Sequence, residues 1–204
     1  MLVIAAVIVA IITITVFLLK NVTQENISYS IDGYGMSAEV SGEVLYISSD
    51  DVLFGNCNSA GEVKIYIPRD TMLEEINMDL GVGDLNLESI NVSETVNINA
   101  GTGDIDIRDM KAETLNIDCG AGDVELKNMD TAKLDIDCGC GDTSIEMAGR
   151  EQDYAIDLSA AMGDIEIGNV SYSGLGTDVL LNEGASKNIF IDCALGSVDV
   201  SFEE

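Results

Sequence analysis

Histidine and tryptophan are absent from this sequence of 204 residues, which also contains a single proline. Histidine is the most frequent general base in enzymes and a common zinc ligand, so its absence removes the usual arrangements for both. Carboxylates alone could still serve a glycosidase, but no tryptophan is present to stack on a sugar ring. We therefore expect a protein that is not an enzyme and that holds neither zinc nor an organic cofactor.

Basic residues are also scarce: 9 lysines and arginines stand against 37 aspartates and glutamates, which gives a formal net charge of −28. A surface with this charge repels nucleic acid and anionic lipid, so neither is an expected partner. Two interpretations of the charge stay open. It keeps a surface protein soluble, or it recruits cations and basic polymers.

One segment carries no charge at all. The run from Leu2 to Leu19 contains no charged residue, no glycine and no proline. At about 1.5 Å per residue a helix of this length matches a hydrocarbon core of about 30 Å. A cleaved signal peptide usually has a shorter apolar core, and a buried helix would need protein all around it. We predict a transmembrane helix or signal anchor over residues 1–20 and a polar tether over 21–32.

The remainder of the chain repeats one pattern. Glycine-aspartate pairs recur at separations of 20, 19, 19 and 22 residues, at Gly83-Asp84, Gly103-Asp104, Gly122-Asp123, Gly141-Asp142 and Gly163-Asp164. Alternating apolar residues precede and follow each pair, as in Leu115 to Cys119 and Val124 to Leu126. Such alternation is typical of short strands, and a fixed period of this length indicates a repeat architecture.

We therefore predict an all-β domain over residues 33–204, a β-solenoid-like stack of about six repeats of 19–22 residues. Its expected parts are irregular N-terminal rungs or a cap over 33–75, regular repeats over 76–170, a loop insertion over 171–187 and a last rung over 188–204. An antiparallel meander or sandwich, with each G-x-G-D segment as a hairpin turn, is the alternative. The constant phase of the repeats favours the solenoid, because parallel stacking of like on like requires it.

The repeated G-x-G-D-[IVL]-x-[IVL] units, the strand from Val63 to Ile67 that ends at Pro68 and the apolar N-terminal run together resemble the bacterial adhesin-like family of β-strand-repeat proteins. The resemblance covers Gly33 to the C-terminus. It implies a β-solenoid-like domain carried outside the membrane, with links in some members to cell-envelope stress. It defines no catalytic or binding residues, and it favours an extracytoplasmic domain although Lys20 after the span argues mildly for the opposite.

The cysteines give a prediction about the interior. Three of them share one repeat position: Cys119, Cys138 and Cys193. Other copies fill it with Leu80, Ala100 and Leu158. A position that accepts these residues predicts a column of buried thiols. Stacked Cβ atoms about 4.8 Å apart disfavour a disulfide, and the Cys138-Gly139-Cys140 segment lacks the remaining ligands for zinc. Cys57 or Cys140 is the expected exposed thiol.

Aspartates form two further columns. The first lies in the turns: Asp84, Asp104, Asp123, Asp142 and Asp164. The second is on the outward side of the strand that precedes each turn: Asp79, Asn99, Asp118, Asp137, Asp157 and Asp192. Two interpretations of the turn aspartates stay open. They bind Ca²⁺ as a ridge of oxygen ligands, or they accept hydrogen bonds from turn amides, as aspartate commonly does.

Three functional hypotheses follow. The first is a single-pass membrane protein with an extracytoplasmic, non-enzymatic module for binding, adhesion or a cell-envelope role, whose partner is a protein or an envelope polymer. The second is a surface scaffold that binds divalent cations. The third is an envelope stress sensor or regulator.

Overall fold

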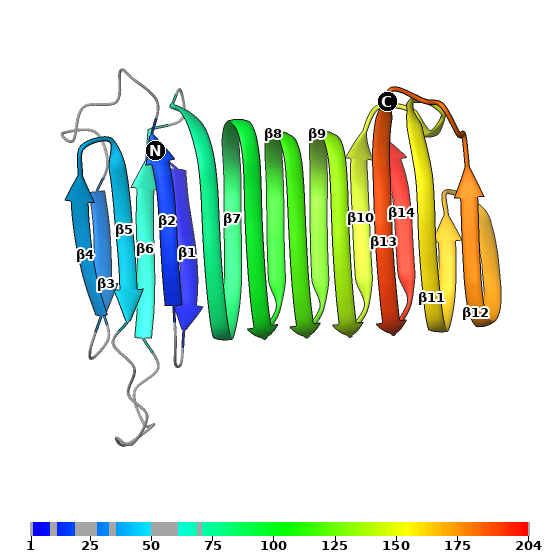
Figure 1. Cartoon of the computed structure of the whole chain (residues 1–204), viewed down its shortest axis with the longest axis horizontal. Coiled ribbons are helices and arrows are strands. Elements are labelled where there is room, and N and C mark those ends of the chain that lie inside the picture. Colours follow the sequence, from blue (N-terminus) through cyan, green and yellow to red (C-terminus); the bar gives the residue numbers. More distant parts are fainter. Residues whose placement is uncertain are drawn as a thin grey trace.

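The computed structural model of the chain describes residues 2–8, 12–18, 28–32, 36–49, 61–68 and 71–203. Nearly all of these residues lie in strands, which stack side by side in one elongated body (Figure 1). The strands are β1 (Leu2–Ile8), β2 (Ile12–Leu18), β3 (Ser28–Asp32), β4 (Met36–Ser41), β5 (Val44–Ser49), β6 (Gly61–Ile67), β7 (Met72–Thr102), β8 (Ile105–Ala121), β9 (Val124–Cys140), β10 (Thr143–Ala148), β11 (Tyr154–Ile167), β12 (Val170–Leu181), β13 (Lys187–Leu195) and β14 (Val198–Glu203), with a 3₁₀ turn at Glu151–Asp153 before β11. The predicted all-β class is confirmed.

The middle of the stack consists of parallel coils. Strands β7, β8 and β9 pair in parallel and in register, so that Ile98 lies beside Ile117, and Ile117 beside Ile136. Within each repeat the chain before the G-x-G-D turn lies on one side, which we call the first face, and the chain after the turn lies on the second face. Apolar side chains from both faces fill the space between them. This arrangement is β-solenoid-like, and it excludes hairpins at the regular G-x-G-D turns.

Close approach of neighbouring turns explains why the motif keeps its glycines. Gly122 has a φ of +147°, and its N–H donates to the Cys140 carbonyl at 2.9 Å. A Cβ at this position would collide with the carbonyl oxygen of Gly103 in the adjacent coil. The position therefore excludes any other residue for two reasons, backbone conformation and lack of space.

The N-terminal third differs from the prediction. The described parts of the segment 1–20 are strands and not a helix: β1 pairs antiparallel with β6 and β7, and β2 with β5 and β7. This segment is rich in valine, isoleucine and threonine, whose branched side chains favour strands where a sheet edge offers partners. Across the described ranges, no helix has both the length and the apolar character needed to cross a bilayer.

Two neighbouring segments are also more regular than predicted. The predicted tether 21–32 ends in β3, which pairs antiparallel with β6, while residues 21–27 lie outside the described residues. In the predicted cap, β4 and β5 form an antiparallel hairpin. The described N-terminal end is therefore an antiparallel extension of the stack.

The last rung is not at the end of the stack. Strand β13 lies between β9 and β11 and pairs in parallel with both. Strand β14 likewise lies between β10 and β11. The chain thus leaves one rung vacant after β10, continues through β11 and β12, and returns to fill the vacancy with its C-terminal residues (Figure 1).

The predicted loop insertion over 171–187 is wrong for most of its length. Residues up to Leu181 belong to β12, which runs antiparallel to β11 from Val170 opposite Ile167 to Leu181 opposite Ile156. Glycine and serine suggested a loop, but Val170, Tyr172, Val179 and Leu181 alternate as a strand requires. Only the turn from Asn182 to Ser186 remains outside the ladder.

Candidate functional site

The turn aspartates form a continuous hydrogen-bonded column. Each carboxylate accepts a bond from the backbone N–H at the same position of the next coil: Asp84 Oδ1 from Asp104, Asp104 Oδ1 from Asp123 and Asp123 Oδ1 from Asp142, at 2.9 to 3.1 Å. Asp142 Oδ1 accepts in the same way from Ser197 of the inserted rung, at 2.8 Å. The amide-capping interpretation of these four residues therefore has direct support.

Asp164 is separated from the other four turn aspartates. The inserted rung places Ser197 beside Asp142, and the strand containing Asp164 follows on the far side of that rung. In the ranges that the structure describes, no three acidic or cysteine side chains are grouped so that they could hold a metal ion. The calcium ridge stays a prediction without a preformed ligand cluster.

The cysteine column lies in the core as predicted. Cys119, Cys138 and Cys193 are buried, stacked on neighbouring rungs, and free. The position beside Cys193 is filled by Ala160, not by Leu158, which pairs with Ile191. Cys119 and Cys138 each precede the last glycine of their turn by three residues, and the same count back from Gly163 gives Ala160. Burial raises the pKa of Cys193 to about 11, which keeps this thiol protonated and unreactive.

Cys140 is exposed at a turn, as predicted, while Cys57 lies outside the described residues. The hydrogen bond with Cys138, together with burial, raises the pKa of the Cys119 thiol.

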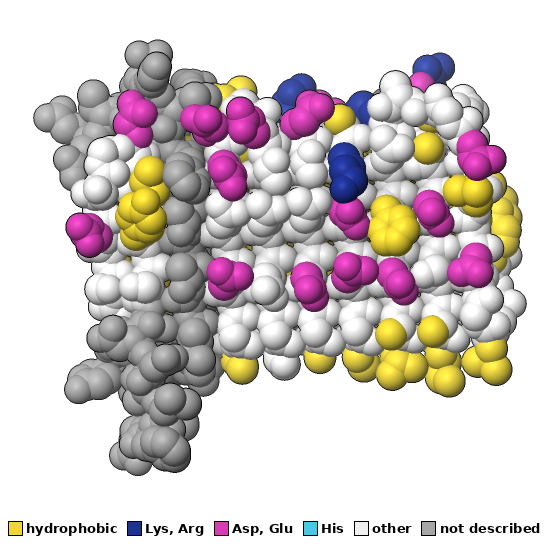
Figure 2. Space-filling view, in the orientation of Figure 1, with side chains coloured by type: hydrophobic (Ala, Val, Ile, Leu, Met, Phe, Trp, Pro, Cys, Tyr) yellow, Lys and Arg dark blue, Asp and Glu magenta, His cyan; other side chains and the backbone are white. Residues whose placement is uncertain are grey.

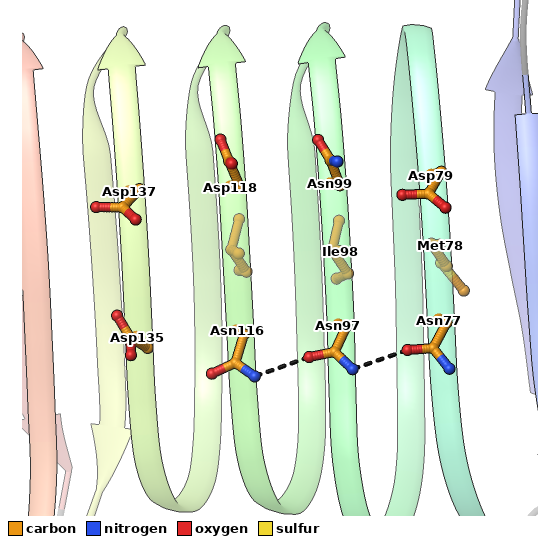
Figure 3. Close-up of a pocket in the computed structure, with 11 residues that line it drawn as sticks. Asn77, Met78, Asp79, Asn97, Ile98, Asn99, Asn116, Asp118, Asp135 and Asp137 are labelled. Atoms are coloured by element: carbon orange, nitrogen blue, oxygen red, sulfur yellow. Dashed lines mark hydrogen bonds between the residues drawn. The ribbon is translucent and has the colours of Figure 1, made fainter.

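The first face carries an open groove between two polar columns, which we call the polar groove (Figure 3). Its volume is about 490 Å³. The polar residues lining it are Asn77, Asp79, Asn97, Asn99, Asn116, Asp118, Asp135 and Asp137. These side chains come from equivalent positions of successive coils, so the groove runs along the stack and across the strands.

Amides line one column of the groove and hold each other in place. Asn116 Nδ2 donates to Asn97 Oδ1 at 2.7 Å, and Asn97 Nδ2 donates to Asn77 Oδ1 at 2.8 Å (Figure 3). The next position of this column is Asp135, whose carboxylate accepts from Lys133 at 2.7 Å. The column is therefore neutral toward the N-terminal end and acidic toward the C-terminal end.

The second column of the groove gathers negative charge. Asp118 and Asp137, which line the groove, lie side by side with Asp192, which continues the column on the next rung. Burial and the charges of neighbouring aspartates, Asp135 first, raise the pKa of Asp137. Among the residues that the structure describes, no lysine or arginine forms an ion pair with these three carboxylates. Asp157, predicted for this column, lies in the other one beside Phe190, and Ser159 takes its place.

Sequence reasoning missed an exposed apolar feature at the turns. The middle residue of each turn points outward, and most of these residues are apolar, so they form a ridge along one edge (Figure 2). The apolar ridge consists of the exposed residues Val82, Cys140, Leu195, Met162 and Leu175, together with the half-buried Ala121. Its exposed fraction is highest at Leu175, at 79%. The sequence did carry a signal for this ridge, because the middle position x of the G-x-G turns is apolar in most repeats.

The comparisons with known proteins assign a family. The family model described as Toastrack DUF4097 matches residues 38–204, most of the chain. No curated protein and no solved structure matches the chain.

Proposed function

The chain belongs to the Toastrack DUF4097 family, and on that premise we propose that it is a non-enzymatic binding scaffold whose polar groove holds an extended cationic polymer. The observation that carries the proposal is the row of Asp118, Asp137 and Asp192, three carboxylates on adjacent rungs that form no ion pair with a lysine or arginine of the described segments. Repulsion among them is relieved when a ligand supplies positive charge. A repeating ligand gains one such contact for every rung that it crosses.

The shape of the groove favours a polymer over a small molecule. Pockets for small ligands usually enclose most of the ligand surface. This groove is open along its length and repeats the same amide and carboxylate groups from coil to coil (Figure 3). An envelope polymer that bears amines or a basic stretch of a partner protein meets these requirements. Adhesion to such a polymer is one form of the proposal.

Calorimetric titration with oligolysine, and with a neutral oligomer of equal length, tests the proposal. We expect saturable binding of oligolysine only, weakened by salt because exposed charges are screened. The double variant Asp118→Asn, Asp137→Asn should bind at least about tenfold more weakly, a loss of about 1.4 kcal/mol. The double variant Glu166→Gln, Asp199→Asn, which removes two neighbouring exposed carboxylates of the second face, is the matched control and should bind as the parent does. Equal losses in both variants would reduce the groove to general charge attraction and reject the proposal.

We also propose that residues 1–20 anchor the protein in the cell membrane and that the repeat domain lies outside the cytoplasm. The support is the uncharged run from Leu2 to Leu19. In lipid, a helix satisfies every backbone group of such a run, whereas in the structure its described strands β1 and β2 pair with β5, β6 and β7. The anchored form would then expose those sheet edges to a partner.

Flotation of the full chain with zwitterionic vesicles tests the anchor. Replacing Val7 and Thr13 by lysine should abolish flotation, because each central lysine costs about 2.5 to 3.5 kcal/mol on insertion. The control replaces Glu25 and Asn26 by lysine and should float. Protection of the repeat domain from protease in intact cells would refute the external placement.

A further inference from the structure

The C-terminal end of the stack is an open sheet edge. Strand β12 is the last strand there, and within the described part of the chain it pairs with β11 alone. Its twelve residues, Val170–Leu181, therefore have a second edge of main-chain groups with no strand beside it. Such an edge is a template for another strand, and stable proteins usually protect it.

The usual protective devices are missing from β12. Lysine, proline, a covering helix or a bulge keeps most edge strands from pairing. The sequence of β12, VSYSGLGTDVLL, has no lysine, arginine or proline, and Asp178 is its single charge. In a chain with a net charge of −28, the residues from Gly168 to Thr177 carry none. The open end is thus a place where a second acidic molecule meets little repulsion.

Apolar side chains are available at the same end. Val170, Tyr172, Val179 and Leu181 lie opposite buried residues of β11, so they face the interior of the stack. Val170 is nevertheless 52% exposed, while Tyr172 and Leu181 are only partly buried. Terminal repeats of stacked proteins normally present a polar outer face, because solubility requires it. At this end of the stack, by contrast, inward-facing apolar side chains of β12 remain partly exposed.

We propose that two copies of this chain pair end to end through antiparallel contact of their β12 strands. Strand β12 bends at the Gly174-Leu175-Gly176 turn, as β11 does at Met162, which pairs with Leu175. A twofold axis through this bend reverses the strand and exchanges the two faces, so β12 of one copy continues the ladder of the other.

In the register centred on the bend, between Leu175 and Gly176, inward residues lie opposite inward residues. This register places Tyr172 against Val179 of the second copy, and Val170 against Leu181 of the second copy. Asp178 then lies opposite Ser173, so no carboxylate faces another. The partly exposed apolar side chains of the two β12 strands then cover each other and form one continuous core.

The contact is of moderate size. The end of a stack whose sheets lie about 10 Å apart presents a footprint of about 300 to 400 Å². Stable interfaces bury about 800 Å² per partner, so the dimer should dissociate on dilution. Main-chain hydrogen bonds along both arms of β12 supply the specificity.

Light scattering after gel filtration and sedimentation equilibrium on the full chain test the proposal. At physiological salt we expect a monomer–dimer equilibrium. Val170→Asp places a carboxylate opposite Leu181 of the second copy and should raise the dissociation constant at least tenfold. Leu175→Asp, at a side chain too exposed to affect folding, brings two carboxylates together at the axis and should weaken the dimer as well. Val82→Asp, 45% exposed at the other end of the apolar ridge, is the matched control and should dimerise as the parent does.

Hydrogen exchange locates the contact. The amides of residues 170–181 should be protected in the dimer and should exchange faster in Val170→Asp, while those of β8 stay unchanged. A protein that stays monomeric at every concentration overturns the proposal. A dimer that survives Val170→Asp and Leu175→Asp, or that Val82→Asp disrupts equally, also overturns it.

Discussion

Two aspartates of the same strand, β9, show how local charge sets the energetic role of a side chain. Hydrogen bonds from Lys111 and Lys187 hold the pKa of Asp130 below its ordinary value. Burial and neighbouring carboxylates raise the pKa of Asp137. The ionised form of Asp130 therefore favours the folded state, and the ionised form of Asp137 opposes it.

The two residues should respond to pH with opposite signs. Because the pKa of Asp137 is raised on folding, its contribution is most favourable below the unfolded pKa of about 3.9 and is lost as pH rises through the folded pKa. Asp137→Asn should therefore raise the melting temperature at pH 7 and change nothing at pH 3. For Asp130 the stability is present above the unfolded pKa and is lost as pH falls through the folded pKa. Asp130→Asn should lower the melting temperature at pH 7, with the difference fading toward low pH.

Thermal melts of the parent and both variants between pH 3 and pH 7 check this prediction. Shifts of the same sign for the two variants at pH 7 would contradict it. The polar columns could be predicted from the repeat, because side chains at equal phase stack in parallel coils. The ion pair of Asp130 with Lys187 could not, because Lys187 lies 57 residues away in the chain.

The inserted rung joins two parts of the stack that would otherwise not touch. Lys187 at the start of β13 donates to Asp130 Oδ1 of β9 and to the Tyr154 hydroxyl of β11, both at 3.2 Å. Tyr154 in turn donates to the Ala148 carbonyl at 2.8 Å. The side chains of Ile189, Ile191, Val198 and Val200 are almost fully buried. Both polar and apolar contacts thus depend on the C-terminal residues.

Removing residues 187–204 should detach β11 and β12 from the rest. Burying four aliphatic side chains contributes about 6 to 12 kcal/mol, which is as large as the stability of a typical domain. We expect protease to cleave within 150–186 of the truncated protein, while amides of β8 remain protected. Lys187→Met, which keeps the rung and removes the half-buried ion pair, should cost only about 1 kcal/mol. Equal protease resistance of truncated and full-length protein would show that the rung is dispensable.

The order of the rungs could not be derived from the sequence. Each repeat presents the same apolar columns, so the copy containing Ile191 fits between any two others as well as at the end. The strand β12 decides the order, because it folds back on β11 and occupies the end of the stack. Its glycines and serines are compatible with a loop, and only pairing with β11 makes them a strand. The strands β1 and β2 could not be predicted from the apolar run at the N-terminus for a related reason, since its residues suit a helix in lipid and a strand beside a sheet edge.

The net charge of −28 acts on the stack as a whole, because parallel coils place equivalent aspartates on adjacent rungs. One carboxylate pair about 5 Å apart costs under about 1 kcal/mol in water, but several columns add such pairs along their length. At 0.1 M salt the screening length is about 10 Å, so repulsion between more distant rungs is already weakened. Stability should therefore rise steadily when salt is added to a dilute buffer.

Thermal melts at increasing concentrations of calcium or magnesium salts distinguish the two roles considered for the turn aspartates. Their Oδ1 atoms accept backbone N–H bonds, so we expect calcium and magnesium at equal concentration to raise the melting temperature by the same amount, through screening alone. Asp104→Asn keeps an oxygen for the Asp123 amide and removes a charge, so it should melt at or slightly above the parent temperature. A stabilisation specific to calcium, and lost in Asp104→Asn, would instead mean that the column coordinates the ion through its remaining oxygens. In that case the scaffold would be one that calcium stiffens, because only the folded stack places these carboxylates on adjacent rungs.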